Sequence, residues 1–159
     1  MKCKWSSKIN NEPICNHEAD DSGYCIFHKK HKTKEENKEV IKLIKEKKIS
    51  DFSGFIFEEN FNINEVIDYS YKELNFTETT FVKEALFNNY IFKGKTIFNQ
   101  TNFLDFTTFI NSKFRYTAIF NNVIFNSKHS NKKIFMGVEF TGQNLVISSV
   151  YNLPRLDGI

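Results

Sequence analysis

Four side chains near the N-terminus have the types and the spacing of a metal site. Cys3, Cys15 and Cys25 are the only cysteines of the chain, and His28 follows Cys25 in a C-x-x-H pattern. Three thiolates and one imidazole form the closed tetrahedral donor set that is typical of structural zinc. The sequence therefore predicts that Cys3, Cys15, Cys25 and His28 bind one zinc ion.

Other interpretations of these residues are weaker on chemical grounds. A disulfide framework needs paired cysteines and an oxidising compartment, but the number of cysteines is odd and no hydrophobic secretory signal follows Met1. Two further histidines compete for a place in the site. His17 lies two residues past Cys15 and could replace it only with strain, whereas His31 stands in a run of lysines that repels a cation.

The segment after the cysteines has the pattern of a helix. Thr33 can cap it, and Glu36 three positions later completes a capping box. Val40, Ile41 and Ile44 fall on one face at helical spacing, and lysines and glutamates fill the other positions. We expect this helix to connect the metal site to the rest of the chain.

Beyond the helix, phenylalanines recur at alternating steps of five and six residues, so the repeating unit has 11 residues and two phenylalanines. The members of this ladder are Phe76, Phe81, Phe87, Phe92, Phe98, Phe103, Phe109, Phe114, Phe120 and Phe125. A constant period of this kind indicates a repeat architecture.

Geometry selects a β-solenoid among the folds that could use this period. On an α-helix, a step of five rotates the side chain by roughly 140°, so the phenylalanines would not share a seam. On a flat strand or in a membrane barrel, an odd step sends the next side chain to the opposite face. If the chain instead turns a corner every five or six residues, each short strand directs one phenylalanine to the axis. Four sides then close a coil of 22 residues.

This arrangement predicts which rings stack on one another. Residues 22 apart should share a column, and adjacent coils should lie about 4.8 Å apart. The expected columns are Phe76 with Phe98 and Phe120, Phe81 with Phe103 and Phe125, Phe87 with Phe109, and Phe92 with Phe114.

A second inward position supports the solenoid and carries a resemblance to a known family. Most residues two positions before each phenylalanine are small or β-branched, as in Thr79-Thr80-Phe81 and Ala118-Ile119-Phe120; Leu74 and Tyr90 are the exceptions. The pattern resembles the pentapeptide-repeat family, whose members fold as right-handed quadrilateral β-helices. The extra residue in alternate units departs from the plain five-residue motif and should widen alternate corners.

The resemblance extends to the N-terminus. The stretch from Gly23 to His28 looks like the short cysteine–histidine module that precedes the repeats in some pentapeptide-repeat proteins, which favours the same four zinc ligands. We therefore expect a mainly β fold with three parts: a zinc-binding module over 1–32, a capping helix and the first strands over 33–75, and the solenoid over 76–159. The aromatic stretch 51–71 is out of register with the ladder and is expected to belong to the cap.

The ladder slips after Phe125 across the polar loop 127–133. It resumes at Phe135 and Phe140, and steps of five continue it to Leu145 and Val150. No helix or charged segment closes the far end, so we expect two chains to meet there as a homodimer or a partner to cover it.

Charge and motifs restrict the classes of function. The net charge of +3 arises from the first 51 residues, and the remainder is neutral. No catalytic fingerprint is present, and Gly94-Lys95-Thr96 lacks the earlier glycine of a phosphate-binding loop. No apolar run could span a membrane. These observations indicate a cytoplasmic protein that is not an enzyme.

The sequence favours a non-catalytic scaffold for protein–protein interaction. Apolar residues precede several phenylalanines and should point outward as a partner-binding surface: Leu86, Ile91, Ile97, Ile119 and Ile124. One alternative is nucleic-acid binding through the basic stretch 29–34, which the small charge excess argues against. Another, taken from the resemblance, is a DNA mimic that binds topoisomerases, but such a rod should be strongly acidic.

Overall fold

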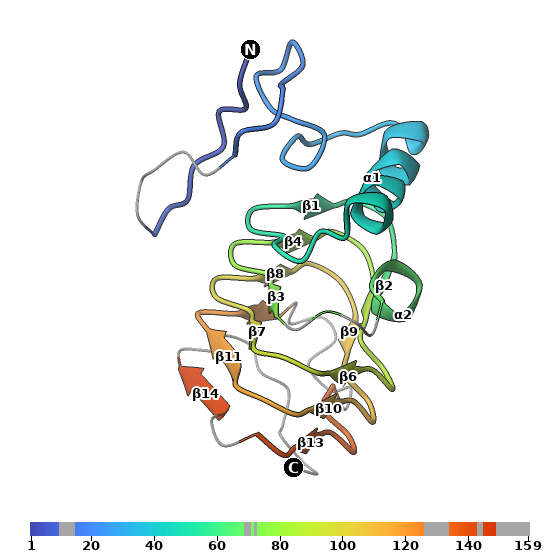
Figure 1. Ribbon diagram of the computed structural model, residues 1–159, viewed down its shortest axis with the longest axis vertical. Helices are drawn as coiled ribbons and strands as arrows, with labels where there is room; N and C mark the ends of the chain where they lie inside the picture. Colours follow the sequence, from blue (N-terminus) through green and yellow to red (C-terminus); the bar gives the residue numbers. More distant parts are fainter. Residues whose placement is uncertain (10–14, 69–70, 72, 126–133, 143–144, 149–159) are drawn as a thin grey trace.

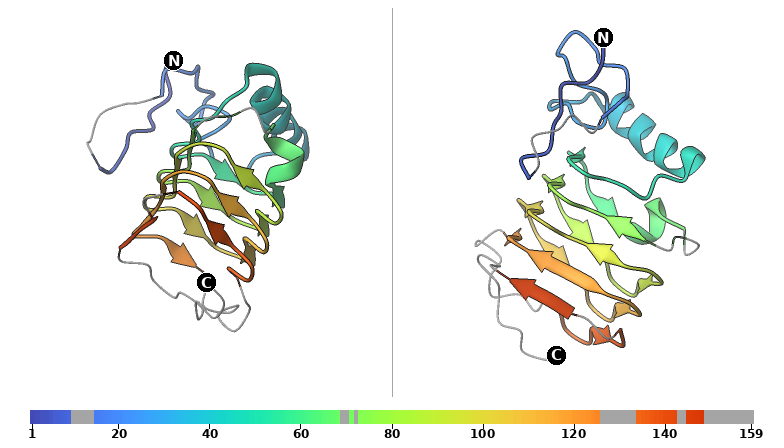
Figure 2. Two further views of the ribbon diagram at one scale, coloured as in Figure 1. Left: turned by 60° about the horizontal axis from the view of Figure 1, so that its bottom comes forward. Right: turned by 60° about the vertical axis from the view of Figure 1, so that its left-hand side comes forward.

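The computed structural model describes residues 1–9, 15–68, 71, 73–125, 134–142 and 145–148. Short parallel strands stack as a β-solenoid of about three turns, as the phenylalanine spacing predicted. The N-terminal segment and two helices, α1 (Lys34–Lys47) and α2 (Ile63–Val66), lie beside its first coils (Figures 1 and 2). In the part of the chain described, no helix is long and apolar enough to cross a bilayer.

The strands form four parallel sheets, one on each side of the coil. The first contains β1 (Ile56–Phe57), β4 (Thr80–Phe81), β8 (Asn102–Phe103) and β12 (Ile124–Phe125). The second contains β3 (Leu74–Asn75), β7 (Thr96–Ile97), β11 (Ala118–Asn121) and β14 (Leu145–Ser148). The third contains β2 (Phe61–Asn62), β5 (Ala85–Leu86) and β9 (Thr107–Thr108), and the fourth β6 (Ile91–Phe92), β10 (Lys113–Phe114) and β13 (Glu139–Phe140).

Stacked phenylalanine rings fill the interior in the predicted columns. Phe98 lies between Phe76 and Phe120, with ring centroids 5.0 and 4.9 Å apart. The other columns stack with centroid distances of 5.1 and 5.0 Å for Phe81–Phe103–Phe125, 4.6 Å for Phe87–Phe109 and 4.2 Å for Phe92–Phe114. Because the rings are nearly parallel within a column and tilted between columns, they occupy the coil without leaving polar atoms in the core.

The two steps of the 11-residue unit correspond to two kinds of corner. The second residue after the first phenylalanine of each five-residue step has a left-handed backbone, for example Asn89 with a φ of 56° and Asn111 with a φ of 55°. Asparagine tolerates this region better than most residues. The six-residue steps turn through bends instead. Alternate corners therefore differ, as the extra residue suggested.

Small inward residues satisfy their polar atoms on the preceding coil. The Thr79 hydroxyl donates to the carbonyl of Phe52, and the Thr101 hydroxyl to that of Phe76, each over 2.8 Å. Tyr90, the residue that fitted the inward pattern least, is buried against Phe92, and its hydroxyl donates to the carbonyl of Asp68 over 3.3 Å.

The first coil begins earlier than the sequence indicated. β1 pairs with β4 and β2 pairs with β5, so strands of the solenoid lie within the stretch 51–71 that was expected to be out of register. Phe52 stacks on Phe76 and Phe57 on Phe81, in both cases 24 residues apart rather than 22. The helix α2 lies within this coil and accounts for the longer step.

The ladder resumes after the slip, but its last strand is shifted. Phe135 stacks on Phe109 and Phe140 on Phe114, as expected. In β14, however, Ile147 rather than Leu145 lies opposite Phe120, because Leu145 pairs with Ala118. Val150 and the polar loop 127–133 lie outside the described residues.

Candidate metal centre

The structure brings Cys3, Cys15, Cys25 and His28 together. Their ligand atoms all lie within 4.8 Å of one another, and all four residues are buried. Nδ1 of His28 lies 3.5 Å from Sγ of Cys3 and 3.2 Å from Sγ of Cys25, and the Sγ atoms of Cys15 and Cys25 are 3.6 Å apart. These four residues could hold a metal ion.

Backbone hydrogen bonds between distant parts of the N-terminal segment hold the cysteines in place. The amide of Cys3 donates to the carbonyl of His17 over 3.0 Å, and the amide of Lys4 to that of Gly23 over 2.9 Å. Gly23 has a φ of 82°, which a residue with a side chain adopts only with strain. A tight turn places the last two ligands side by side, because the His28 amide donates to the Cys25 carbonyl over 3.0 Å.

A second layer of contacts orients the imidazole of His28. Its Nε2 lies 2.9 Å from the carbonyl oxygen of Ser53. Since a carbonyl only accepts, Nε2 carries the proton and Nδ1 presents its lone pair to the sulfurs. Trp5 stacks on the imidazole with ring centroids 4.5 Å apart, and Phe27 stacks on Phe55 over the same distance.

Burial sets the protonation of the site when no metal is bound. Removal from water raises the pKa of the Cys15 thiol to about 12 and also raises the pKa of Cys25. The same cause lowers the pKa of His28 to about 4, so its imidazole is neutral at physiological pH. A metal ion would replace the thiol protons and balance the thiolate charge that the buried site otherwise disfavours.

The two alternative histidines lie outside the group of four. His17 approaches it, with Nδ1 3.3 Å from Sγ of Cys15, but its side chain is exposed and packs edge-on against Phe27. His31 is exposed at a left-handed corner, and its amide donates to the carboxylate of Glu58.

Two lysines of the basic stretch 29–34 have internal partners. Lys29 forms ion pairs with Asp20 over 2.7 Å and Glu36 over 2.6 Å. Lys32 is buried, and its ammonium donates to the carbonyls of Lys29 and Ile56. Neither ammonium is therefore freely available to phosphates.

The five residues predicted to bind a partner lie on different sides of the coil. Leu86, Ile91 and Ile124 fall in β5, β6 and β12, which belong to three different sheets. Only Ile97 and Ile119 are neighbours, paired in register between β7 and β11. The structure thus brings two of the five together.

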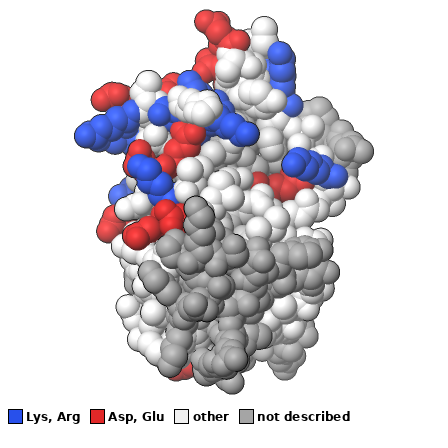
Figure 3. Space-filling model, turned by 180° about the vertical axis from the view of Figure 1, so that it is seen from behind, with Lys and Arg blue, Asp and Glu red and all other residues white. Residues whose placement is uncertain are grey.

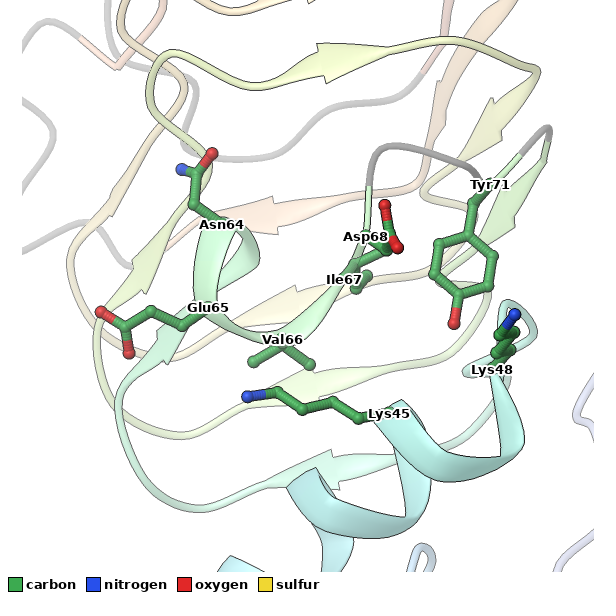
Figure 4. Close-up of a pocket in the computed structure, with 8 residues that line it drawn as sticks. All are labelled: Lys45, Lys48, Asn64, Glu65, Val66, Ile67, Asp68 and Tyr71. Atoms are coloured by element: carbon green, nitrogen blue, oxygen red, sulfur yellow. The ribbon is translucent and has the colours of Figure 1, made fainter.

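A separate cleft of about 330 Å³ lies between the end of α1 and the segment that follows β2. Figure 4 shows Lys45 and Lys48 on the helix side and Glu65 and Asp68 on the other. Because two ammonium groups face two carboxylates, the charges of this cleft favour neither anions nor cations.

Sequence reasoning found the ligands and anticipated that Trp5 and Phe27 would pack beside the site, but it missed the contact to Ser53. That contact uses a backbone carbonyl, which any residue type could supply, so no sequence signal could have identified it. Searches of family models, of curated proteins and of solved structures each find no match to this chain.

Proposed function

We propose that this protein is a non-catalytic scaffold of the pentapeptide-repeat type, with a structural zinc ion in its N-terminal module and a protein-binding surface on one side of its solenoid. The single observation that carries the proposal is the column of apolar side chains on the sheet of β3, β7, β11 and β14. Ile97, Ile119 and Val146 occupy successive positions of this column in register.

The donor set and its distances favour zinc among possible metals. Zinc–sulfur bonds of about 2.3 Å in a tetrahedron separate the sulfur atoms by about 3.8 Å. The separation of 3.6 Å between Cys15 and Cys25 is close to that value. The hydrogen bond from His28 to a backbone carbonyl is the second-layer contact common to zinc-bound histidines.

The repeat pattern supports assignment to the pentapeptide-repeat family. Four sheets around a phenylalanine core and small residues two positions before the rings agree with that family's motif. The right-handed coil, the capping role of α1 and the cytoplasmic location belong to this proposal.

The outward apolar column suits protein contact better than a polar solenoid face would. Ile97 and Ile119 are half-buried by their neighbours, whereas Val146 is 42% exposed. Burying adjacent branched side chains on a flat parallel sheet gives a partner a continuous apolar strip without disturbing the core. The identity of this partner is to be found by affinity capture and mass spectrometry.

The test replaces two residues of the column. Ile97→Glu with Ile119→Glu should abolish capture of the partner, and the circular dichroism spectrum should remain unchanged because both side chains point away from the core. A matched control, Leu86→Glu with Ile91→Glu, places the same charges on other sheets and should retain capture. If the control loses capture equally, or the first variant retains it, the column is not the binding surface.

The observed charge distribution does not favour nucleic acid or topoisomerase as the partner. Figure 3 shows basic and acidic side chains intermingled in the upper part of the molecule. A phosphate-binding face would collect positive charge, and a DNA mimic would collect negative charge. We therefore infer that the partner is a protein recognised through apolar contact.

A further inference from the structure

A polar cleft of about 370 Å³ lies between the N-terminal segment and one side of the solenoid. Residues 4–8 form part of one wall and pass the corner beside β1 and β4 (Figures 1 and 2). The backbone amide of Lys8 donates to the carboxylate of Glu78 over 2.7 Å, which fixes this wall to the second coil. The cleft is distinct from the metal centre and from the apolar column.

Three lysines contribute to the lining of the cleft. Lys4, Lys8 and Lys30 are exposed, and within the described part of the chain none of them forms an ion pair. Glu78 is the acidic residue of the lining, and one of its oxygens already accepts the amide of Lys8. The cleft therefore holds an excess of positive charge that a ligand with at least two negative charges would balance.

The floor of the cleft offers neutral hydrogen-bonding groups at regular intervals. Thr80 and Asn102 are paired in register on adjacent strands, so a hydroxyl and an amide lie about 4.8 Å apart along the stack. Gln100 contributes a second amide from the corner of the same coil as Asn102, where its φ of 53° is left-handed. Such groups suit the hydroxyls and ring nitrogens of an organic molecule.

Two aromatic residues complete the lining. Tyr24 is 39% exposed, and Trp5 is half-buried beside it with one face on the imidazole of His28. Aromatic edges and faces favour a flat organic group over a bare inorganic anion. The volume is in the range of small-molecule sites, which starts at about 300 Å³.

We propose that this cleft binds a small organic phosphate of nucleotide size. The lysines contact the phosphate groups as point charges, and the aromatic and amide groups contact the organic part. This inference does not depend on the proposed partner surface, because none of its residues belongs to the apolar column.

Trp5 provides a direct test, because it is the only tryptophan of the chain. Its fluorescence, excited at the red edge where tyrosine does not absorb, is followed while the intact protein is titrated with ATP, AMP or inorganic pyrophosphate. We expect saturable binding of ATP and weaker binding of pyrophosphate. Failure of ATP to saturate in the millimolar range, or equal affinity for pyrophosphate, would overturn the proposal.

A charge-matched pair of variants tests the lysines. Lys4→Gln, Lys8→Gln and Lys30→Gln together should weaken ATP binding at least about tenfold, because hydrogen bonds to charged groups are the stronger ones. The control changes three exposed lysines elsewhere: Lys34, Lys38 and Lys95.

The control should bind ATP within about twofold of the unmodified protein, since distant surface charges are largely screened by salt. Equal loss in both triple variants, or none in the cleft variant, contradicts the proposal. Lys30→Gln alone, which should still weaken binding, serves if the triple variant does not fold. Tighter binding of an oligoglutamate peptide or a single-stranded oligonucleotide than of ATP would instead assign the cleft to a macromolecule.

Discussion

Nε2 of His28 lies 2.9 Å from the carbonyl oxygen of Ser53, so the metal centre and the first coil share a hydrogen bond. Ser53 is itself held from two sides: its hydroxyl donates to Asp51 over 2.6 Å and accepts from the side-chain amide of Asn75 over 3.0 Å. Asn75 belongs to β3 on the next coil. The orientation of one metal-ligating imidazole is thereby fixed by the solenoid, and the order of the N-terminal segment depends on both.

Removal of a ligand should release the metal, whereas removal of a neighbouring histidine should not. We expect His28→Ala or Cys25→Ser to lose bound zinc, measured by elemental analysis of the purified protein, and to lower the melting temperature of the N-terminal module. His17→Ala and His31→Ala are the controls and should retain one zinc per chain, because both side chains lie outside the buried group. Loss of zinc in the His17 variant would mean that it is a ligand.

The stability of the protein after treatment with a chelator should depend on pH in a bell shape. Burial lowers the pKa of His28 from 6.5 to about 4, so between these values the unfolded chain binds more protons and stability falls as the pH falls. Burial raises the pKa of Cys15 from 9.0 to about 12, so above pH 9 the unfolded chain releases more protons and stability falls again. Thermal unfolding followed by Trp5 fluorescence should show both limbs. His28→Gln should flatten only the acid limb and Cys15→Ser only the alkaline one; unchanged limbs would refute the assignment.

Loss of one central ring should destabilise the solenoid strongly. Phe98 is fully buried between Phe76 and Phe120. Phe98→Ala removes both stacking contacts and leaves a cavity, so we expect a loss of about 3–5 kcal/mol in the free energy of unfolding, measured in urea. Leu104→Ala is the control: its side chain is 48% exposed, and such changes stay within about 0.5 kcal/mol. A loss below about 1 kcal/mol for Phe98→Ala would show that the columns contribute little.

A methyl group at Gly54 should displace Trp5. Gly54 has a φ of 71°, and a Cβ atom there would lie 2.0 Å from Cε2 of the indole. Gly54→Ala should therefore destabilise the protein by more than about 1 kcal/mol and shift the Trp5 emission as the stack on His28 opens. In the background of Trp5→Ala, where only the backbone strain remains, the same change should cost less. Equal costs in both backgrounds would show that the clash is relieved without consequence.

The sequence predicted the features that depend on side-chain type at fixed spacing. The phenylalanine columns follow from the step of five and six residues, and the capping box of α1 joins Thr33 and Glu36 as expected. The first coil was not recognised because α2 lengthens it by two residues, so that Phe52 and Phe57 fall outside the 22-residue register. The partner surface was predicted only in part, because five outward positions on a four-sided coil need not share a side.

The position of Tyr90 shows a different limit. The inward pattern favours small residues, and a phenol in that place would bury a polar group at a cost. The structure resolves this conflict with the carbonyl of Asp68, which accepts a hydrogen bond from the hydroxyl. Such a partner comes from the preceding coil, 22 residues earlier in the chain, and local sequence patterns do not specify it.

The spacing of the stacked rings also constrains how this protein can change length. Duplicating one complete coil, such as residues 82–103, would add an identical layer and extend the stack by one strand spacing, about 4.8 Å. Inserting any other number of residues would rotate every later ring away from its column unless a bulge absorbed the excess, as α2 does near the start. Evolution or an engineer can therefore lengthen this rod in whole increments, like a ruler with fixed divisions, without redesigning its cross-section.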